Sequence, residues 1–461
     1  MRAPRVAVVG SGPSAFFAAE ALLKAGILVD MIERLPTPFG LVRSGVAPDH
    51  PKIKAITAAF EKILATPGLA FFGNVEVGRD LDVRELAELY DGVVLACGAS
   101  ADAPLGIEGE ALAGSLGAGA FVGWYNGHPD HRGLAVPLDG ERAVVVGNGN
   151  VALDVARLLL SPPERLAATD IAAAAAAALA ASRVREVHLL GRRGPVQASF
   201  TPAELRELSR LDGIAVHVAP EDLELDPACQ AELDMPHADN ARKTMKLLQE
   251  IAAAPPRPEA RRLHLHFRAG PAALLGRGAV AGIRVARMAL EGPPAGRTAV
   301  PTGEAFDLSC GLVVRSTGFR ASPLAGVPSD GRGGCVPNRE GRVTLSGRVL
   351  PGLYVTGWMK RGPSGVIGTN RPCGQETAQA VIADLAGRPV RSDPGFRLET
   401  LLSGRRIAFV DREGWRRIDA CERARGSAAG KPREKLVVRA DLLTAARDGA
   451  DLQAPLAAAV P

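Results

Sequence analysis

Short, continuous apolar runs recur along the chain, each followed by a glycine-rich turn and a helix-like segment. Val6–Val9 is the first run, and Phe16–Lys24 follows it with helical composition. Ile27–Ile32 is a second run and ends at Glu33. Continuous apolar runs of this length are typical of strands buried on both faces of a parallel sheet. The opening segment therefore predicts a strand, a glycine turn, a helix and a second strand.

The first turn reads Gly10-Ser-Gly12-Pro-Ser-Ala15. Gly10 permits a tight turn, Gly12 lets the backbone approach a pyrophosphate, and Ala15 keeps helix and strand close. The pyrophosphate would lie on the free N–H groups of the helix N-terminus. Glu33 follows Gly10 at roughly the 20-residue spacing of an acid that binds a ribose hydroxyl. We predict a dinucleotide site here, and an ordinary strand–helix turn is the alternative.

A second unit of this kind begins at Arg142–Val146. The strand is followed by Gly147-Asn-Gly149-Asn-Val-Ala152 and a helix. Two glycine turns in the same context are more specific than one. The distance to the next expected strand, Val184–Leu190, is lengthened by an insertion at residues 161–182 that contains an alanine-rich helix, which we expect to be peripheral.

The expected strand Val184–Leu190 ends in basic residues rather than in an acid. The sequence after it is Gly191-Arg192-Arg193-Gly194. An acid at this position would repel a 2′-phosphate, whereas two guanidinium groups would bind it. The pair Arg192 and Arg193 therefore predicts NADP rather than NAD, with an exposed basic turn as the alternative.

Two ionisable residues with competing interpretations stand at helix starts. His50 follows Asp49 in the proline- and glycine-rich loop 35–51, where we expect no ordinary helix or strand. The simple interpretation is that Asp49 caps a helix at residues 52–64 and His50 lies on the surface. Glu204 stands three residues after Thr201 in an expected helix at residues 200–211, which is the position of a capping box.

The histidines do not predict a metal site. Leu263–Phe267 and Val280–Met288 alternate like antiparallel strands and would place His264 and His266 on one face. His128 and His131 form a second close pair. Neither pair has a cysteine or carboxylate at metal-ligand spacing, so we expect no bound metal.

Composition narrows the class of protein. The chain has 461 residues, 47% of them hydrophobic, and a formal net charge of +5. Its six cysteines form no CxxC pair, which indicates free thiols in a reducing compartment and excludes a redox dithiol of that type. No apolar run reaches the roughly 18 residues of a membrane span, and no interleaved aromatic and basic stripe indicates nucleic-acid binding. We expect a cytoplasmic, monomeric protein.

The last third predicts a return to the first domain. Leu312–Val314 is an expected strand, and Leu353–Thr356 is another that leads into a glycine loop at residues 357–370 and a helix, Gln375–Leu385. Residues 388–461 are charged and mixed, and we expect a frayed tail at the C-terminus.

Several segments together are similar to the adrenodoxin-reductase-type ferredoxin–NADP⁺ reductases, in the glutathione-reductase-like superfamily. They are GSGPSAFFAAEALL, PFGLVRSGVAPDHP, FFGNVEVGRDL, GNGNVALDVARLLL, GRRGPVQASFTPAELREL and GWMKRGPSGVIGTN. The resemblance runs from about Val6 to about Leu385. It implies an α/β fold of two Rossmann-like three-layer dinucleotide-binding domains, with an NADP domain (103–318) inserted in a split FAD domain (1–102 and 319–461).

The resemblance also implies roles for individual residues. FAD would contact Gly10, Gly12, Pro13, Ser14, Ala15, Glu33, Arg34, Gly40, Leu41, Val77, Trp358, Gly365, Val366 and Ile367. NADP(H) would contact Gly147, Asn148, Gly149, Asn150, Val151, Arg192, Arg193, Glu204 and Gly365. His50 and Glu204 would lie near the reacting rings, as positioning and electrostatic groups. Nothing is carried over to the insertion or to the C-terminal tail.

The implied reaction passes a hydride from NADPH to FAD and then single electrons to a [2Fe–2S] ferredoxin or adrenodoxin-like protein. The basic residues Arg206, Arg210, Arg242, Lys243 and Lys246 form a docking hypothesis for such an acidic partner. One alternative is an NADPH-dependent flavin oxidase, diaphorase or monooxygenase. Another is a non-catalytic nucleotide-binding subunit of a larger redox complex.

Overall fold

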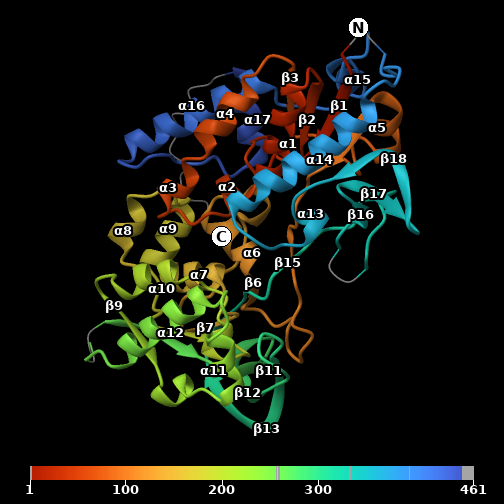
Figure 1. Ribbon diagram of the computed structural model, residues 1–461. Coiled ribbons are helices and arrows are strands. Elements are labelled where there is room, and N and C mark those ends of the chain that lie inside the picture. Colours follow the sequence, from red (N-terminus) through yellow and green to blue (C-terminus); the bar gives the residue numbers. More distant parts are fainter. Residues whose placement is uncertain (1–2, 256, 258–259, 332–333, 394, 449–461) are drawn as a thin grey trace. The chain divides into compact units, whose positions relative to one another are not determined.

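The computed structural model describes residues 3–255, 257, 260–331, 334–393 and 395–448 (Figure 1). Its internal contacts divide the chain into two compact units. Unit 1 contains Met1–Ala101, Asn126–Arg132 and Phe319–Pro461. Unit 2 contains Asp102–Tyr125 and Gly133–Gly318. The short segment Asn126–Arg132 thus lies with unit 1, which the sequence did not indicate.

Unit 1 is built on a mostly parallel sheet with the strand order β16-β17-β18-β4-β1-β2-β3. Its strands are β1 (Arg5–Val9), β2 (Leu28–Glu33), β3 (Leu69–Gly73), β4 (Gly92–Leu95), β16 (Asn338–Arg339), β17 (Arg342–Leu345) and β18 (Arg348–Val355). Its helices are α1 (Pro13–Lys24), α2 (Leu41–Ser44), α3 (Pro51–Lys54), α4 (Thr57–Leu64), α5 (Val83–Leu89), α13 (Trp358–Arg361), α14 (Asn370–Leu385), α15 (Leu398–Gly404), α16 (Arg412–Ala428) and α17 (Arg439–Asp448), with 3₁₀ turns at Pro129–His131 and Ile367–Thr369. The central strand β1 pairs in parallel with both β2 and β4.

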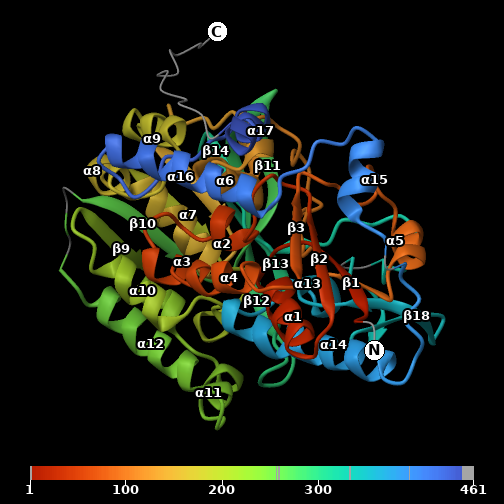
Figure 2. The same cartoon turned by 90° about the horizontal axis from the view of Figure 1, so that it is seen from above.

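Alternate residues of β1 supply the two hydrophobic cores of unit 1. Val6 and Val8 face a core shared with α1, α4, α14, α16 and α17. Ala7 and Val9 face a second core shared with α5 and α15. Because both faces of the strand are buried, a continuous apolar run is what the position requires. In Figure 2, α14 lies along α1, and the two helices pack directly on each other.

Unit 2 is built on a parallel sheet with the order β6-β14-β7-β8-β10-β9 and an antiparallel sheet β11-β12-β13. Its strands are β6 (Ser115–Gly117), β7 (Arg142–Val146), β8 (Glu186–Leu190), β9 (Ile214–Val218), β10 (Arg261–His266), β11 (Ala269–Arg277), β12 (Ala279–Glu291), β13 (Thr298–Ser309) and β14 (Leu312–Arg315). Its helices are α6 (Ala118–Tyr125), α7 (Asn150–Leu160), α8 (Pro163–Ala167), α9 (Ala173–Ala180), α10 (Pro202–Ser209), α11 (Pro227–Leu233) and α12 (Asp239–Ala252), with 3₁₀ turns at Pro195–Gln197 and Pro220–Leu223. Short strands β5 (Ala101–Asp102) and β15 (Phe319–Arg320) lie where the chain passes from one unit to the other.

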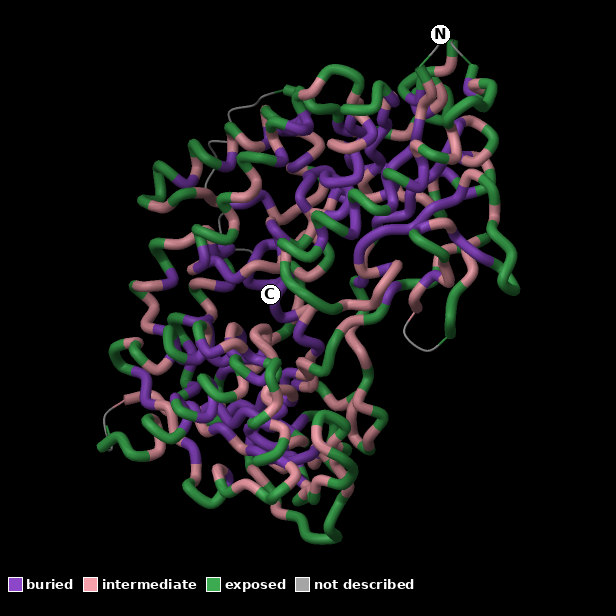
Figure 3. The backbone as a smooth tube through the Cα atoms, in the orientation of Figure 1, coloured by how far each residue is buried: buried purple, intermediate pink, exposed green. Residues whose placement is uncertain are grey.

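Unit 2 also has three layers. Helix α7 packs on β7, β8 and β10. On the parallel sheet, Val144 and Val313 share a hydrophobic core with Ile283 and Val285 of the antiparallel sheet. Buried stretches of backbone, purple in Figure 3, follow the central strands of both units. The predicted α/β class and the paired three-layer arrangement are confirmed.

Several element predictions were wrong. Strand β10 runs parallel to β8 and β9 and is not antiparallel. Its alternation was misleading, because the polar positions are histidines on a partly buried face. Strand β14 belongs to the sheet of unit 2, between β6 and β7, and the chain returns to unit 1 only after it.

The expected helix at residues 52–64 is two short helices, α3 and α4. The long loop before it contains the one-turn helix α2.

Two segments are better integrated than the sequence suggested. The alanine-rich helix α9 is not merely peripheral, because Ala175 and Leu179 are buried and α9 packs on α6. Helices α15–α17 form part of unit 1, with Trp415 and Leu442 in its core. The expectation of a frayed C-terminus falls on residues 449–461, which lie outside the described residues. Among the described residues, no helix is both long and apolar enough to cross a bilayer.

Candidate functional site: two nucleotide loops

The first glycine loop has the geometry of a phosphate cradle. Gly10 has a φ of +108°, and a Cβ there would lie 2.5 Å from the carbonyl oxygen of Ala96. Gly12 has a negative φ, and a Cβ on it would meet no atom within 4 Å. Gly10 is therefore required by the fold, whereas Gly12 leaves open space in front of the first turn of α1. An open, Cβ-free N-terminus of a 12-residue helix fits a pyrophosphate.

The acid at the end of β2 lies at this loop, as predicted. The Glu33 carboxylate accepts hydrogen bonds from the Ser11 backbone N–H at 3.0 Å and the Ser11 hydroxyl at 2.6 Å. It also accepts one from the Leu35 N–H at 2.9 Å. These bonds hold the carboxylate where strand β2 ends, which is where an adenosine ribose would be bound. The sequence reasoning missed the contact of Ser11 with Glu33, because the x in GxGxxA has no required side chain.

The C-terminal segment of unit 1 also contacts the first glycine loop and the start of α1. The Ser14 hydroxyl donates a 2.8 Å hydrogen bond to Asn370 Oδ1 at the start of α14. A Cβ on Gly357, whose φ is +68°, would lie 2.7 Å from Ser14 Oγ. A Cβ on Gly374 would lie 2.7 Å from the Ser14 carbonyl oxygen. Gly357 and Gly374 therefore allow α14 to approach α1. Asn370 is the last residue of the segment GWMKRGPSGVIGTN, but the sequence analysis did not identify it as a site residue.

Apolar side chains near these helix starts are left exposed. Leu41 is 40% exposed and Val366 is 63% exposed. Trp358 is half-buried, stacks on Phe319 at a centroid distance of 5.7 Å, and donates its indole N–H to the Ser364 carbonyl. Exposed apolar groups beside an open phosphate cradle suit a dinucleotide that carries an aromatic ring system.

Other predicted contacts of unit 1 lie close to the loop or on its border. Gly40 has a φ of +49°, and a Cβ on it would lie 3.1 Å from the Gly12 Cα. The Arg34 side chain forms an ion pair with Asp130, which explains why residues 126–132 belong to unit 1. The remaining predicted positions are Pro13 and Ala15 in the first turn of α1, Val77 in a bridge with Leu81, and Gly365 and Ile367 in the loop before α14.

His50 is buried, not on the surface. The residue is 8% exposed, and its carbonyl oxygen accepts the N–H groups of Ile53 and Lys54. His50, and not Asp49, occupies the N-cap position of α3. The simple interpretation of these two residues is therefore wrong on both counts.

The second glycine loop repeats the geometry of the first. Gly147 has a φ of +127°, and a Cβ there would lie 2.2 Å from the Ser316 carbonyl oxygen. A Cβ on Gly149 would meet nothing within 4 Å, and α7 begins at the next residue, Asn150. The loop also anchors the segment that follows β8, because the Asn148 carbonyl accepts the N–H groups of Ser199 and Phe200. Val151 lies in the first turn of α7 and is half-buried.

The basic pair lies at the end of the strand adjacent to this loop. Strands β7 and β8 pair in parallel, so both end at the same edge of the sheet. A Cβ on Gly191, just after β8, would lie 2.8 Å from Asn148 Nδ2. Arg192 is exposed and Arg193 is half-buried. Two guanidinium groups beside an open helix N-terminus fit a nucleotide with an additional phosphate.

Glu204 does not form the capping box that its spacing suggested. Thr201 Oγ1 accepts the Glu204 N–H, but the Thr201 N–H donates to Asn150 Oδ1 instead of to Glu204. One Glu204 carboxylate oxygen lies 3.7 Å from an Arg157 nitrogen, and the Arg157 side chain is fully buried. The carboxylate is thus held against α7 and is not used to cap its own helix.

The histidines of β10 have a carboxylate neighbour after all. Glu186 of β8 lies close to His188 and His264, and ligand atoms of these three residues lie within 4.8 Å of one another. The sequence reasoning missed this group because the carboxylate comes from a different strand, 78 residues before His264.

All six cysteines are free thiols.

Comparisons with known proteins agree with this geometry. Residues 4–221 match the family described as pyridine nucleotide-disulphide oxidoreductase. The chain is 46% identical over 465 residues to the NADPH-ferredoxin reductase FprA of Mycobacterium tuberculosis, covering 96% of this chain and 99% of that protein. It is 45% identical over 458 residues to the mitochondrial NADPH:adrenodoxin oxidoreductase of Homo sapiens, covering 96% and 92%.

A solved structure agrees over the same extent. The structure of Mycobacterium tuberculosis FprA in complex with NADPH matches with a TM-score of 0.90 at 45% identity, covering 96% of this chain and all of that one.

Proposed function

The chain belongs to the family of NADPH-ferredoxin reductases and NADPH:adrenodoxin oxidoreductases, and from this premise we propose that it passes electrons from NADPH through FAD to a [2Fe–2S] ferredoxin. The observation that carries this proposal is the pair of glycine loops. Each unit has an open helix N-terminus, at Gly12 and at Gly149, and only the second has a basic pair at the neighbouring strand end. One unit therefore suits a dinucleotide without a 2′-phosphate and the other suits NADPH.

The residues of the chain provide binding and orientation. The N–H groups at the start of α1 and α7 bind pyrophosphates, and Glu33 accepts a ribose hydroxyl. Arg192 and Arg193 bind the 2′-phosphate. FAD, when bound, converts between the two-electron chemistry of a nicotinamide and the one-electron chemistry of an iron–sulfur cluster. No dithiol is needed for this transfer, which agrees with the six free cysteines.

His50 and Glu204 are proposed as positioning groups. His50 is buried at the start of α3, where its backbone ends the long loop that carries Gly40 and Leu41. Glu204 is half-buried beside Arg157 at the start of α10. Each residue lies at the start of a helix, which holds it in place. A group that orients a bound ligand needs such a fixed position.

The proposed docking surface for ferredoxin consists of exposed basic residues on α10, at its C-cap and on α12: Arg206, Arg210, Arg242, Lys243 and Lys246. Arg242 is the least available of them, because it binds the Leu233 and Met235 carbonyls and pairs with Asp239. An acidic, one-electron protein acceptor is the partner that such a surface attracts.

The relatives include a bacterial and a mitochondrial protein, so membership of the family does not indicate the cytoplasmic location expected from the sequence.

The test compares the rates at which different electron acceptors are reduced at the same NADPH concentration. We expect a [2Fe–2S] ferredoxin to be reduced much faster than oxygen, and we expect Arg206→Gln with Lys243→Gln and Lys246→Gln to raise the ferredoxin KM and flatten its salt dependence. Arg183→Gln, an exposed arginine elsewhere in unit 2, is the control. Fast oxygen consumption with slow ferredoxin reduction would favour an oxidase instead.

A further inference from the structure

Neighbouring strands of unit 2 place histidines on one face of the parallel sheet. His188 of β8 is the register partner of His264 on β10, and His264 is the partner of His217 on β9. His266 lies two residues after His264 and so faces the same side. The rings stack, with centroids 4.7 Å apart for His188 and His264 and 5.2 Å for His217 and His264.

This face departs from what a parallel sheet normally requires. The alternate residues Val187, Leu189, Leu263 and Leu265 are fully or almost fully buried on the opposite face. Parallel strands are usually apolar on both faces. Packing alone therefore accounts for the apolar face and leaves the row of imidazoles unexplained. His188 lies in the middle of β8, and the row reaches the carboxyl end of β10 at His266.

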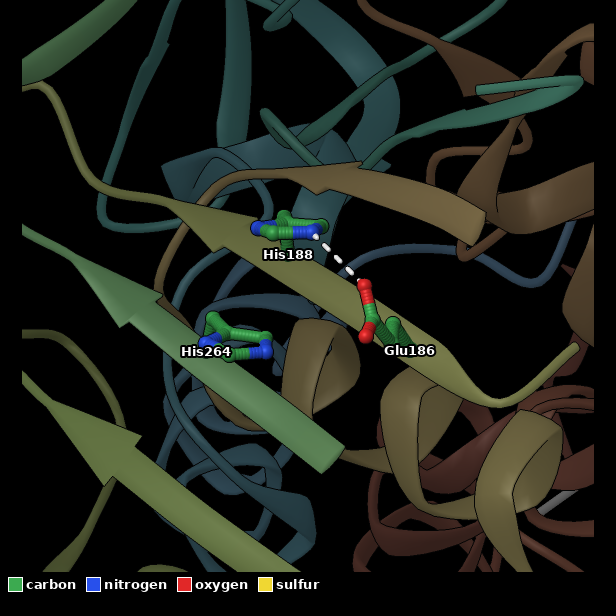
Figure 4. Close-up of side chains that lie close together, drawn as sticks. All are labelled: Glu186, His188 and His264. Atoms are coloured by element: carbon green, nitrogen blue, oxygen red, sulfur yellow. Dashed lines mark ion pairs between the residues drawn. The ribbon is translucent and has the colours of Figure 1, made fainter. Parts of the chain in front are cut away.

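A carboxylate completes the group. Glu186 is two residues before His188 on β8, and one of its oxygens lies 3.9 Å from His188 Nε2. Figure 4 shows Glu186 and His188 projecting from β8 beside the His264 ring on β10. One ligand atom from each of the three residues lies within 4.8 Å of the others.

The hydrogen bonding of His188 is unusual. Its Nδ1 lies 2.9 Å from His266 Nε2, whereas its own Nε2 is buried and has no hydrogen-bond partner among the described residues. When Nδ1–H donates to His266, Nε2 presents a lone pair toward Glu186. Metal-bound histidines have this arrangement, because the nitrogen that does not bind the metal donates to a fixed acceptor.

The protonation states suit metal ligands. Burial, reinforced by the neighbouring imidazoles, lowers the pKa of His188 to about 4, and burial also lowers the pKa of His264. Burial alone would raise the pKa of Glu186, but hydrogen bonds from Arg142 and Arg262 outweigh it and the pKa is lowered. Neutral imidazoles and an ionised carboxylate are the forms that bind a metal ion.

We propose that Glu186, His188 and His264 bind one Zn²⁺ ion, with His266 orienting His188. Two imidazoles and a carboxylate are a known Zn²⁺ donor set, with water in the fourth position. Zinc–ligand bonds are about 2.0–2.2 Å long, so one ion can bridge the 3.9 Å between His188 and Glu186 once the stacked His188 and His264 rings turn to direct their lone pairs at the same point. The site is independent of the proposed reductase function and would link β8 to β10.

Two arginines compete with the ion for Glu186. Arg142 pairs with Glu186 at 2.8 Å and Arg262 also pairs with it, but their side chains are 51% and 43% exposed. Both guanidinium groups can turn toward solvent, so a divalent ion can displace them from Glu186. Removing Arg142 should therefore strengthen metal binding, which is the opposite of the effect of removing a ligand.

The test uses the untagged holoenzyme after treatment with a chelator and dialysis. ZnCl₂ is titrated by calorimetry, and bound zinc is counted by elemental analysis. We expect one Zn²⁺ per chain. His266→Gln should weaken binding by about 10–100-fold, as loss of an orienting partner does, and His188→Gln or His264→Gln should weaken it further. Arg142→Gln should tighten it.

Matched controls keep the result decisive. His237→Gln removes an exposed histidine of the same unit and should leave the zinc affinity unchanged. Flavin absorbance and circular dichroism check that each variant is folded, and the wild type and Arg142→Gln decide the matter if a ligand variant is not. The proposal is overturned if the wild type binds no stoichiometric Zn²⁺, if folded His188→Gln and His264→Gln variants bind it as the wild type does, or if Arg142→Gln fails to tighten binding.

Discussion

The Ser14 hydroxyl donates a 2.8 Å hydrogen bond to Asn370 Oδ1, and so joins the first turns of two helices that are 356 residues apart in sequence. Helix α1 follows the first strand of the chain and α14 follows the last strand of the same sheet. The nucleotide loop of unit 1 is therefore completed by residues from both ends of the chain. Three predictions concern this loop and its counterpart in unit 2, and a fourth concerns the buried Glu422.

Ser14→Ala should loosen the junction between α1 and α14. Loss of a buried hydrogen bond should lower the free energy of unfolding by about 1 kcal/mol. FAD should also dissociate faster, because the two helix starts are no longer tied. Guanidinium denaturation and flavin release on dilution measure the two effects. Ser427→Ala on α16 is an exposed control, and an unchanged rate of flavin release from Ser14→Ala would contradict the assignment.

Gly10 and Gly12 should respond differently to an added side chain. Gly10→Ala places a Cβ 2.5 Å from the Ala96 carbonyl at a φ of +108°, so we expect a less stable or misfolded unit. The Cβ of Gly12→Val would meet no protein atom within 4 Å, so the apoprotein should keep its melting temperature but lose FAD. Thermal melts with and without added FAD separate the two outcomes. Full FAD occupancy in Gly12→Val would place the cofactor elsewhere.

Replacing both Arg192 and Arg193 by Gln should remove the preference for NADPH. Hydrogen bonds to charged groups contribute about 1.5–3 kcal/mol, so the NADPH Kd should rise by at least about tenfold. The NADH Kd should stay the same, because NADH has no 2′-phosphate. Flavin reduction kinetics with each nucleotide measure this, and Arg183→Gln serves as the basic-residue control. A parallel loss of affinity for both nucleotides would indicate a structural role instead.

Glu422 should make stability depend on acid pH. It is fully buried on α16 and pairs with Arg43 of α2 at 2.6 Å and with Arg433 at 2.7 Å. Burial alone would raise its pKa, but Arg43 and Arg433 outweigh burial, and the pKa is lowered from the usual value near 4.5. A carboxylate whose pKa is lowered in the folded state stabilises the fold at pH values above its usual pKa. This stabilisation is lost as the pH falls through the folded-state pKa.

The corresponding variant is Glu422→Gln. Removing one partner of a buried ion pair costs roughly 3–5 kcal/mol, so its free energy of unfolding at pH 7 should fall by about that amount. The difference from the wild type should shrink toward acid pH, as measured by denaturation at a series of pH values. A constant difference from pH 7 to pH 3 would rule out the titration of Glu422 as its cause.

The sequence was informative where the requirement is local. The apolar run at residues 6–9 has to be a doubly buried strand, and the turns at Gly10 and Gly147 need positive φ angles that glycine allows. These requirements are met within a few residues of chain. The basic pair after β8 could be recognised for the same reason, because it follows directly from where one strand ends.

The sequence was less informative where partners come from distant segments. Glu204 has the spacing of a capping box, but Arg157 of another helix takes its carboxylate. His264 and His266 looked isolated because Glu186 reaches them only through the pairing of β8 with β10. The sequence did not show how the charged segment after residue 388 packs, because the buried partners of Glu422, Arg43 among them, come from distant parts of the chain.

The two glycine loops, one in each unit, are proposed to bind FAD and NADPH. The most direct measurement is an anaerobic titration of the purified protein with NADPH and, separately, with NADH, followed by the visible flavin absorbance. We predict stoichiometric bleaching by NADPH at much lower concentrations than by NADH. A protein that stays colourless and does not bleach after reconstitution with FAD would contradict the claim, and an equal response to both nucleotides would contradict the role of Arg192 and Arg193.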